Sequence, residues 1–322
     1  MRTTFSWRLV KLLCASAVLV LSARILVSTG IAALSKQTEP SPLPAEDYRL
    51  ISPHTYQYLL NQPDVCRKKS PFLVFMVPVG PQEAAARQAV RKTWGSSGQD
   101  TLTLFYAGLP EGGQLTPQQE QLEEESRHYK DIIQMNFVDS YHNLTIKTMM
   151  MMKWLMTHCP TASYAMKVDA DIFVNVFYLI RRLKDSPRQG FITGSVIRDG
   201  KPRRDPNSRW YLSEELYSED SFPPYVSGAG YVFSTDLAGR ISWASRFVRA
   251  IPLEDVYVGL CLHVLAVQPV YSFSLLSLRN LFVIQNLEYD RCTFAGLVIV
   301  NGFKPSELLR VWEDFSKGHS KC

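Results

Sequence analysis

Two acidic pairs, far apart in the sequence, have the residue types and spacing that could do chemistry. The first pair, Asp169 and Asp171, follows an apolar stretch that predicts a strand. Alternate side chains of an extended chain point the same way, so these carboxylates could share one hard divalent cation and neutralise a diphosphate. The second pair, Glu254 and Asp255, opens an apolar stretch that predicts a helix. A carboxylate there could accept the proton of an attacking hydroxyl group.

Each pattern also has a simpler structural interpretation. Acidic residues cap helices and solvate turns, and the helix dipole favours carboxylates in a first helical turn. Arg87 and Arg91 are four residues apart and therefore share one face of a predicted helix. Their guanidinium groups could present paired donors to a phosphate, or they could solvate a surface. Spacing alone leaves these alternatives open.

The elements that must position these residues alternate along the chain. Strands are predicted over 71–77, 101–107, 132–138 and 163–168, and helices over 83–94, 117–129, 144–156 and 176–184. This alternation is typical of βαβ units around a mostly parallel sheet, with ligands at the carboxyl ends of the strands. The Pro-, Asp- and Ser-rich residues 200–224 predict long loops over that edge.

The N-terminal segment predicts a membrane anchor. It is almost wholly apolar, it follows three cationic residues, and about 20 such residues cross a bilayer as a helix. Arg24 shortens the apolar core, so a cleaved signal peptide is the alternative. We expect a cytoplasmic tail over 1–11, a transmembrane signal-anchor over 12–34, a lumenal stem over 35–65 whose prolines block regular helix and strand pairing, and one globular domain over 66–322.

The composition suits one large domain and argues against nucleic-acid binding. The chain has 322 residues, of which 46% are hydrophobic. Four of the cations behind its formal charge of +5 lie in the first 34 residues, which contain no acid, so the remainder is near neutral. Nucleic-acid binding requires a basic face on the folded part, and only short basic runs occur.

The cysteines and one sequon are compatible with a lumenal domain. Disulfides persist in such a compartment, and Asn143-Leu-Thr145 is a glycosylation sequon. The number of cysteines beyond the predicted anchor is odd, so at least one is unpaired or pairs between chains, and the connectivity stays open. These cysteines are Cys66, Cys159, Cys261, Cys292 and Cys322.

Five motifs in order, spread over roughly residues 66 to 315, resemble the β-1,3-galactosyltransferase family, which is glycosyltransferase family 31. Their order and spacing match as well. The motifs are Arg87-xxx-Arg91-x-Thr-Trp-Gly95, Tyr141-x-Asn-Leu-Thr-x-Lys-Thr148, Lys167-x-Asp-x-Asp-x-Phe-x-Asn175, Pro223-Pro-Tyr-x-Ser-Gly-x-Gly-Tyr231 and Glu254-Asp-Val-Tyr-Val-Gly259.

The resemblance implies a single-pass type II Golgi membrane enzyme whose lumenal domain has the GT-A fold, a Rossmann-like α/β fold with a mostly parallel sheet. It implies inverting, Mn²⁺-dependent transfer of galactose from UDP-galactose to the 3-hydroxyl of a terminal N-acetylhexosamine-type acceptor on a glycoprotein or glycolipid, forming a β1,3 linkage. Transfer from UDP-GlcNAc or UDP-GalNAc is the alternative within the family.

The resemblance also assigns roles to residues. Asp171 is the expected direct metal ligand with Asp169 beside it, and Asp255 is the expected base with Glu254 next to it. Near the UDP it places Arg87, Arg91, Lys167 and Asp169, and around the sugars it places Trp210, Tyr211, Ser227, Gly228 and Gly230.

Two departures from the family pattern bear on the site. Val226 stands where relatives commonly carry Cys, which accounts for the odd number of thiols. Asn301 stands where many relatives carry a His that resembles a metal ligand. An amide oxygen binds a hard cation more weakly than a ligand suited to Mn²⁺, so Asn301 is expected as a weaker third ligand. This motivates another alternative, an inactive, lectin-like Golgi paralogue.

Overall fold

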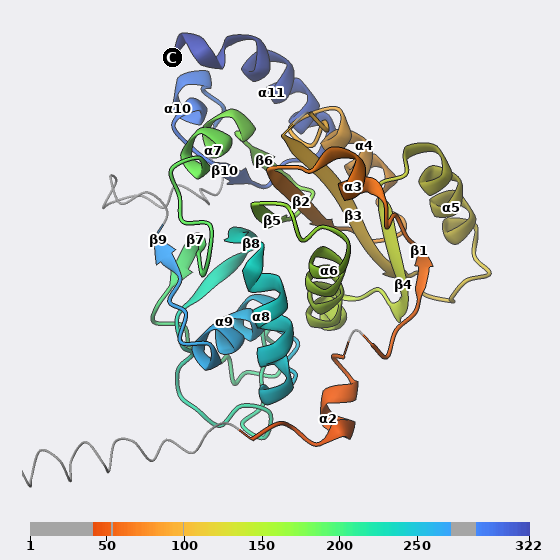
Figure 1. Cartoon of the computed structure of the whole chain (residues 1–322), viewed down its shortest axis with the longest axis vertical. Helices are drawn as coiled ribbons and strands as arrows, with labels where there is room; N and C mark the ends of the chain where they lie inside the picture. The colour runs from red at the N-terminus through yellow and green to blue at the C-terminus, as the bar shows by residue number, and fades with distance from the viewer. Residues whose placement is uncertain (1–40, 53, 99, 272–287) are drawn as a thin grey trace, which may run out of the picture. The chain divides into compact units, whose positions relative to one another are not determined.

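The apolar segments form one central sheet in the computed structural model, which describes residues 41–322 except 53, 99 and 272–287. The sheet order among the described strands is β1-β4-β3-β2-β5-β8-β7-β9 (Figure 1). The strands are β1 Tyr58–Leu60, β2 Leu73–Pro78, β3 Thr101–Leu109, β4 Ile132–Val138, β5 Tyr164–Val168, β7 Ile192–Ile197, β8 Tyr225–Ser234 and β9 Val270–Tyr271.

The four central strands are parallel, and antiparallel strands flank them. β2 pairs in parallel with β3 and β5, and β3 pairs in parallel with β4. β1 runs antiparallel to β4, while β8 runs antiparallel to both β5 and β7. The predicted α/β architecture with a mostly parallel central sheet is therefore confirmed. Because the carboxyl ends of β2 to β5 meet at one edge, the segments that follow these strands come together there.

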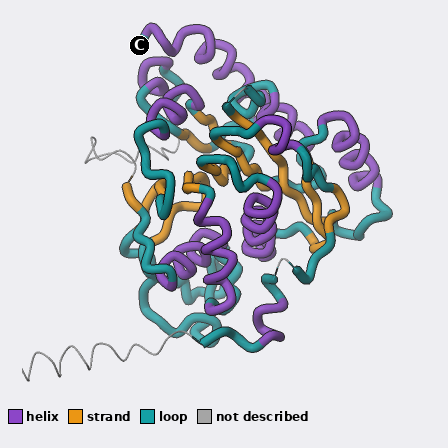
Figure 2. The backbone as a smooth tube through the Cα atoms, in the orientation of Figure 1, coloured by secondary structure: helices purple, strands orange, loops and turns teal. Residues whose placement is uncertain are grey.

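Helices cover both faces of the sheet (Figures 1 and 2). Along β2, Leu73, Phe75 and Val77 belong to one buried cluster, and Val74 and Met76 belong to the other. This alternation is the period-2 pattern of a strand buried on both faces. The first cluster includes residues of α4 Ala84–Arg91, α5 Pro117–Tyr129, α7 Val176–Leu183, α10 Arg291–Ala295 and α11 Pro305–Gly318, and the second includes residues of α3 Val65–Lys69, α6 Leu144–His158, α8 Asp236–Ala244 and α9 Glu254–Val264.

The predicted elements of the parallel half are confirmed, with ends that differ by a few residues at most. Helix α5 has the bounds expected from its capping residues, because the Thr116 hydroxyl accepts a hydrogen bond from the Gln119 N–H and Pro117 occupies the first turn. Residues 200–224 contain neither helix nor strand, as predicted.

The expectation that the predicted stem lacks regular structure is wrong for part of it. Helix α2 Ala45–Arg49 and strand β1 both lie within it, and β1 joins the central sheet. The prolines do not prevent this, because Pro44 precedes the first turn of α2 and β1 ends before Pro63. The cytoplasmic tail and the signal-anchor lie outside the described residues, and no helix within the described part is long and apolar enough to cross a membrane.

A second, two-stranded sheet carries residues of the site. Strands β6 Ile172–Val174 and β10 Ile299–Asn301 pair antiparallel, with Asn301 opposite Ile172. They lie more than 120 residues apart in the sequence. The chain between Asp171 and Phe303 is thereby closed into a loop whose two ends lie side by side.

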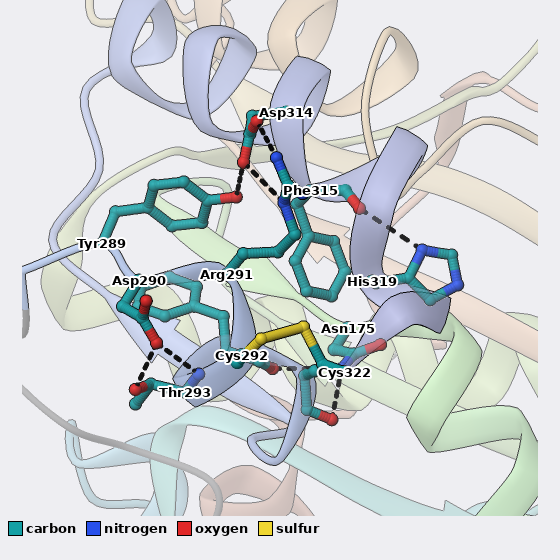
Figure 3. Close-up of a disulfide and its surroundings, with 12 residues drawn as sticks. Asn175, Tyr289, Asp290, Arg291, Cys292, Thr293, Asp314, Phe315, His319 and Cys322 are labelled. Carbon is teal, nitrogen blue, oxygen red and sulfur yellow. Dashed lines mark hydrogen bonds and ion pairs between the residues drawn. A yellow bond between two sulfur atoms is a disulfide. The ribbon is translucent and has the colours of Figure 1, made fainter.

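The structure contains two disulfides, which give the cysteine connectivity that the sequence left open. Cys66 is bonded to Cys159, and Cys292 is bonded to Cys322 (Figure 3). Cys261 is the remaining cysteine of the described residues, and its thiol is buried and unpaired. The odd number of cysteines is thus explained by Cys261 of helix α9, which forms no disulfide.

Candidate functional site

The first acidic pair lies at the carboxyl edge of the parallel strands. Asp169 directly follows β5, and its N–H donates to the carbonyl of Ala229 on β8. Its carboxylate Oδ1 lies 2.7 Å from the ammonium group of Lys167, which is near the end of β5. The apolar strand therefore ends in alternating charged residues at the edge where α/β sheets bind ligands.

Lys167 joins the two acidic pairs. Its ammonium group contacts Asp169, donates to the Gly228 carbonyl and lies 3.7 Å from Glu254 Oε2. Burial alone would lower the pKa of Lys167, but the carboxylates of Asp169 and Glu254 raise it above its ordinary value. Lys167 is therefore a buried cation held between two acidic clusters that are about 85 residues apart in the sequence.

The two carboxylates of the second pair differ in environment. Glu254 is 6% exposed, and its Oε1 accepts a hydrogen bond of 2.7 Å from the Tyr231 hydroxyl. Burial raises the pKa of Glu254. Asp255 is half-buried at the first turn of α9, where its oxygens accept from the N–H groups of Gly228 and Val256. Of the two, Asp255 is the one that an incoming group can reach.

Asp171 and Asn301 come together through the β6–β10 sheet. The Phe303 N–H donates to the Asp171 carbonyl at 2.9 Å, and Asn301 stands opposite Ile172. Asp171 is exposed, but desolvation by nearby protein atoms and the neighbouring Asp169 carboxylate raise its pKa. The Asn301 Oδ1 atom is buried and has no hydrogen-bond partner among the described residues.

The chemistry of Asp169, Asp171 and Asn301 suits a hard divalent cation, and their joint binding of one stays a prediction. No three His, Cys, Asp or Glu side chains of the described chain gather into a metal site. Two carboxylates that repel each other and an unpartnered buried amide oxygen nevertheless supply the oxygen ligands that such a cation takes. A bound cation would satisfy the orphaned oxygen, which is otherwise costly to bury.

Two glycines of strand β8, Gly228 and Gly230, lie in different surroundings that each leave little room for a side chain. A Cβ atom at Gly228 would lie 3.2 Å from Glu254 Oε2, and the Gly228 backbone contacts both Lys167 and Asp255. Gly228 is therefore part of the site. A Cβ at Gly230 would instead lie 3.0 Å from the Ile299 side chain, in the apolar core. The predicted approach of a ligand to Gly230 is not needed to explain this glycine. Ser227 lies on the same strand, next to Gly228.

Arg87 and Arg91 are engaged inside the protein. Arg87 is 1% exposed and binds both oxygens of Glu125, while its remaining bonds go to the carbonyls of Gly80 and Pro81. Arg91 pairs with Glu125 and with Asp131. The solvated-surface alternative is therefore wrong. These contacts support a positioning role for the loop that follows β2, and direct contact with a nucleotide stays a prediction.

The structure does not test the roles of three further predicted residues. Trp210 and Tyr211 are exposed on the long loop between β7 and β8, and their assignment to the sugar pockets stays a prediction. The Asn143 amide donates to the Val138 carbonyl, and the Thr145 side chain is buried with its hydroxyl bonded to the Ile251 carbonyl. This geometry does not favour sugar attachment to the folded chain, and glycosylation of Asn143 stays a prediction.

One polar cluster at the same edge was not found from the sequence. The Lys147 ammonium is buried and contacts both oxygens of Asp139 and the Val79 carbonyl, and the Gly108 N–H donates to Asp139. It thus ties the end of β3 to the residues that follow β2 and β4. A lysine inside the methionine-rich stretch of α6 is the signal that could have revealed it, because a buried lysine requires an acidic partner.

Comparison with known proteins shows the family to which the chain belongs. A protein-family model described as Galactosyltransferase matches residues 85–272, and the chain belongs to this family of sugar-transferring enzymes. Over 282 residues it is 41% identical to beta-1,3-galactosyltransferase 1 of Mus musculus and of Homo sapiens, covering 85% of this chain and 83% of each relative.

Two more distant similarities complete the comparison. The chain is 40% identical over 279 residues to human beta-1,3-galactosyltransferase 2, covering 83% of this chain and 64% of the relative. A solved apo structure of the WbbM bifunctional glycosyltransferase matches with a TM-score of 0.41 and 9% identity, over 77% of this chain and 50% of that one.

Proposed function

We propose that this glycosyltransferase moves galactose from UDP-galactose to the 3-hydroxyl of a terminal N-acetylhexosamine-type acceptor, with inversion, forming a β1,3 linkage. The observation that carries the proposal is the junction at Lys167, which brings both acidic clusters to one edge of the parallel sheet. The family membership and the relatives' names support galactose as the sugar.

Asp255 is the proposed general base. Its carboxylate is oriented by two backbone N–H groups and remains half-exposed, as acceptance of a proton from an acceptor hydroxyl requires. Glu254 is buried against Tyr231 and Lys167, so its proposed part is to hold Lys167 and the start of α9 in place. A single displacement at the anomeric carbon, with Asp255 on the face opposite the leaving UDP, gives inversion.

Asp169, Asp171 and Asn301 are the proposed ligands of Mn²⁺. When bound, such a cation neutralises charge on the departing diphosphate. Lys167 and the Gly228 backbone order the edge between these residues and Asp255, and Arg87 holds the loop after β2 on which the nucleotide would rest. Trp210, Tyr211 and Ser227 are proposed to line the sugar pockets.

The cellular setting is a further part of the proposal. We propose a single-pass type II protein of the Golgi membrane with the described domain in the lumen. The two disulfides support an oxidising compartment, where such bonds persist. Protease protection of the domain in sealed Golgi vesicles, lost on adding detergent, is the expected result. Digestion without detergent would place the domain on the cytoplasmic side.

A donor panel tests the activity. Purified residues 36–322 are incubated with UDP-galactose, UDP-GlcNAc and UDP-GalNAc and with N-acetylhexosamine acceptors, with and without Mn²⁺, and products are analysed for linkage. We expect a β1,3-linked galactose product that requires the cation and is inhibited by UDP. Preference for another donor would reassign the sugar. Absence of product with every donor from folded protein would favour an inactive paralogue, the alternative that Asn301 raises.

A further inference from the structure

Trp94 is bonded to the backbone next to Asp171. It lies just beyond helix α4, is 1% exposed, and packs edge-on against Phe75 of β2 at a centroid distance of 5.3 Å. Its indole Nε1 donates to the Ile172 carbonyl at 2.7 Å. Ile172 directly follows Asp171, so this bond attaches the start of β6 to the rigid layer formed by α4 and β2.

Asn175 holds the other end of β6. Its backbone N–H donates to the Val298 carbonyl, and its side-chain amide donates to the carbonyls of Phe294 and Ala295 at 3.1 and 3.2 Å. Its Oδ1 accepts from the Tyr178 N–H and caps α7. Figure 3 shows Asn175 beside the Cys292–Cys322 disulfide, which fastens this C-terminal segment. Asn175 therefore fixes the chain that leads into β10.

Between these two attachments the β6–β10 register is determined. Asn301 faces Ile172, and the Phe303 N–H reaches the Asp171 carbonyl. The Asn301 side chain, whose Oδ1 is buried without a hydrogen-bond partner among the described residues, depends on this register for the face of the strand that it occupies. A shift by one residue in a strand pair would turn Asn301 to the opposite face.

We propose that Trp94 and Asn175 are positioning residues that hold Asp171 and Asn301 in the geometry for binding a divalent cation. This inference rests on the proposed function, because it takes these two residues as cation ligands. Trp94 acts through a single N–H with one acceptor, and Asn175 acts through backbone carbonyls of the segment that delivers Asn301. Both side chains are almost fully buried, so they act through the backbone that they bind.

Trp94→Phe tests the first attachment, and Trp154→Phe is its matched control. Trp154 is also fully buried, and its Nε1 also donates one hydrogen bond, of 2.8 Å to Asn61, but it lies in α6 among the other buried cluster. Mn²⁺ affinity is measured by electron paramagnetic resonance in the presence of UDP, and stability by urea unfolding. Both variants should lower the urea midpoint. Trp94→Phe should weaken Mn²⁺ binding about tenfold or more, as loss of a supporting hydrogen bond typically does, whereas Trp154→Phe should retain the wild-type affinity.

Asn175→Ser provides a second test that does not depend on the folding of Trp94→Phe. Serine keeps an oxygen to cap α7 but lacks the amide N–H groups that reach Phe294 and Ala295. The same weakening of Mn²⁺ binding is expected. Wild-type affinity in either folded variant, or equal weakening in Trp154→Phe, would overturn the positioning role. A wild-type protein that binds no Mn²⁺ would instead remove the proposed cation site, and this inference with it.

Discussion

The carboxylate of Asp255 is held by hydrogen bonds at both oxygens and is still accessible. Gly228 and Val256 donate these bonds from backbone N–H groups, so the side chain does not need a charged partner to fix its orientation. Glu254 takes the opposite arrangement, with its carboxylate buried beside Tyr231 and Lys167. Two adjacent acids thus have different surroundings, because Asp255 stays partly exposed at the start of α9 while Glu254 is buried.

Asp255→Asn should lower kcat by about 100-fold or more, because an amide cannot accept the acceptor's proton. UDP affinity should not change. Asp236→Asn is the matched control, since Asp236 also lies in the first turn of a helix and also accepts a backbone N–H, but on α8 at Gly190. Initial rates and UDP titrations check this. Near-wild-type turnover in Asp255→Asn would remove the base assignment.

Cys261 should be inert in the folded protein. Burial raises the pKa of its thiol to about 12 from an ordinary value of 9.0. An acid whose folded-state pKa is raised contributes stability below its unfolded pKa and loses it as the pH rises toward the folded value. We therefore expect no reaction with a thiol reagent at pH 8 before unfolding. Cys261→Ala should lose less stability than wild type between about pH 9 and 12, by up to about 1.4 kcal/mol per pH unit. Prompt labelling of native protein would contradict this.

The sequence predicted the places of the acidic residues better than the contacts of the two arginines. Asp169 and Asp171 follow a predicted strand, so their place at the carboxyl edge followed from the parallel sheet. The approach of Asp255 to that edge depends on helix α9, which the strand pattern did not place. The ion-pair partners of Arg87 and Arg91 could not be predicted, because Glu125 and Asp131 lie about 35 to 40 residues away and resemble ordinary surface acids. Side-chain pairing across elements is not encoded in local spacing.

At the scale of elements, the ion pairs of Glu125 join helix α5 to helix α4. Glu125 binds Arg87 at 2.6 Å and Arg91 at 2.5 Å, and its own side chain is 12% exposed. Glu125→Gln would leave two largely buried guanidinium groups short of a partner. We expect a loss of about 3–5 kcal/mol in the free energy of unfolding.

Denaturant titration measures this loss, and Glu313→Gln is its control. Glu313 pairs with Lys317 on α11, where both side chains are more than 70% exposed, so no measurable change is expected. Equal effects of the two substitutions would show that the network around Glu125 does not support the α4–α5 packing.

The two disulfides should differ in their contribution to stability. Cys66–Cys159 spans 93 residues and Cys292–Cys322 spans 30. In the chain-entropy account a longer loop gives more stabilisation, here by about 1 kcal/mol. Paired Ser substitutions, compared by urea unfolding, should therefore show the larger loss for Cys66–Cys159. A larger loss for the C-terminal bond would mean that native packing outweighs loop entropy.

Element prediction succeeded where hydrophobic periodicity was unbroken and failed in short segments. The parallel strands and their helices follow from apolar runs. Strands β1, β6 and β10 have three residues each, too short for a pattern, and they depend on partners distant in sequence. The sheet that unites Asp171 with Asn301 was therefore not visible in the sequence.

At the scale of the whole molecule, the sheet brings residues from the middle and the end of the chain to one edge. Two acidic clusters share Lys167, and the C-terminal segment adds Asn301 through β10. Because these parts come from the middle and the end of the chain, removal of the C-terminal segment would delete a proposed cation ligand together with the packing of α11. The site is thus a property of the complete domain.

Anomalous diffraction at the manganese edge, from crystals of the globular domain grown with UDP and Mn²⁺, would locate the proposed cation. We expect one strong peak within coordination distance of Asp171 and Asn301, with Asp255 facing the same site. A peak elsewhere in active protein, or activity without any bound cation, would contradict this expectation.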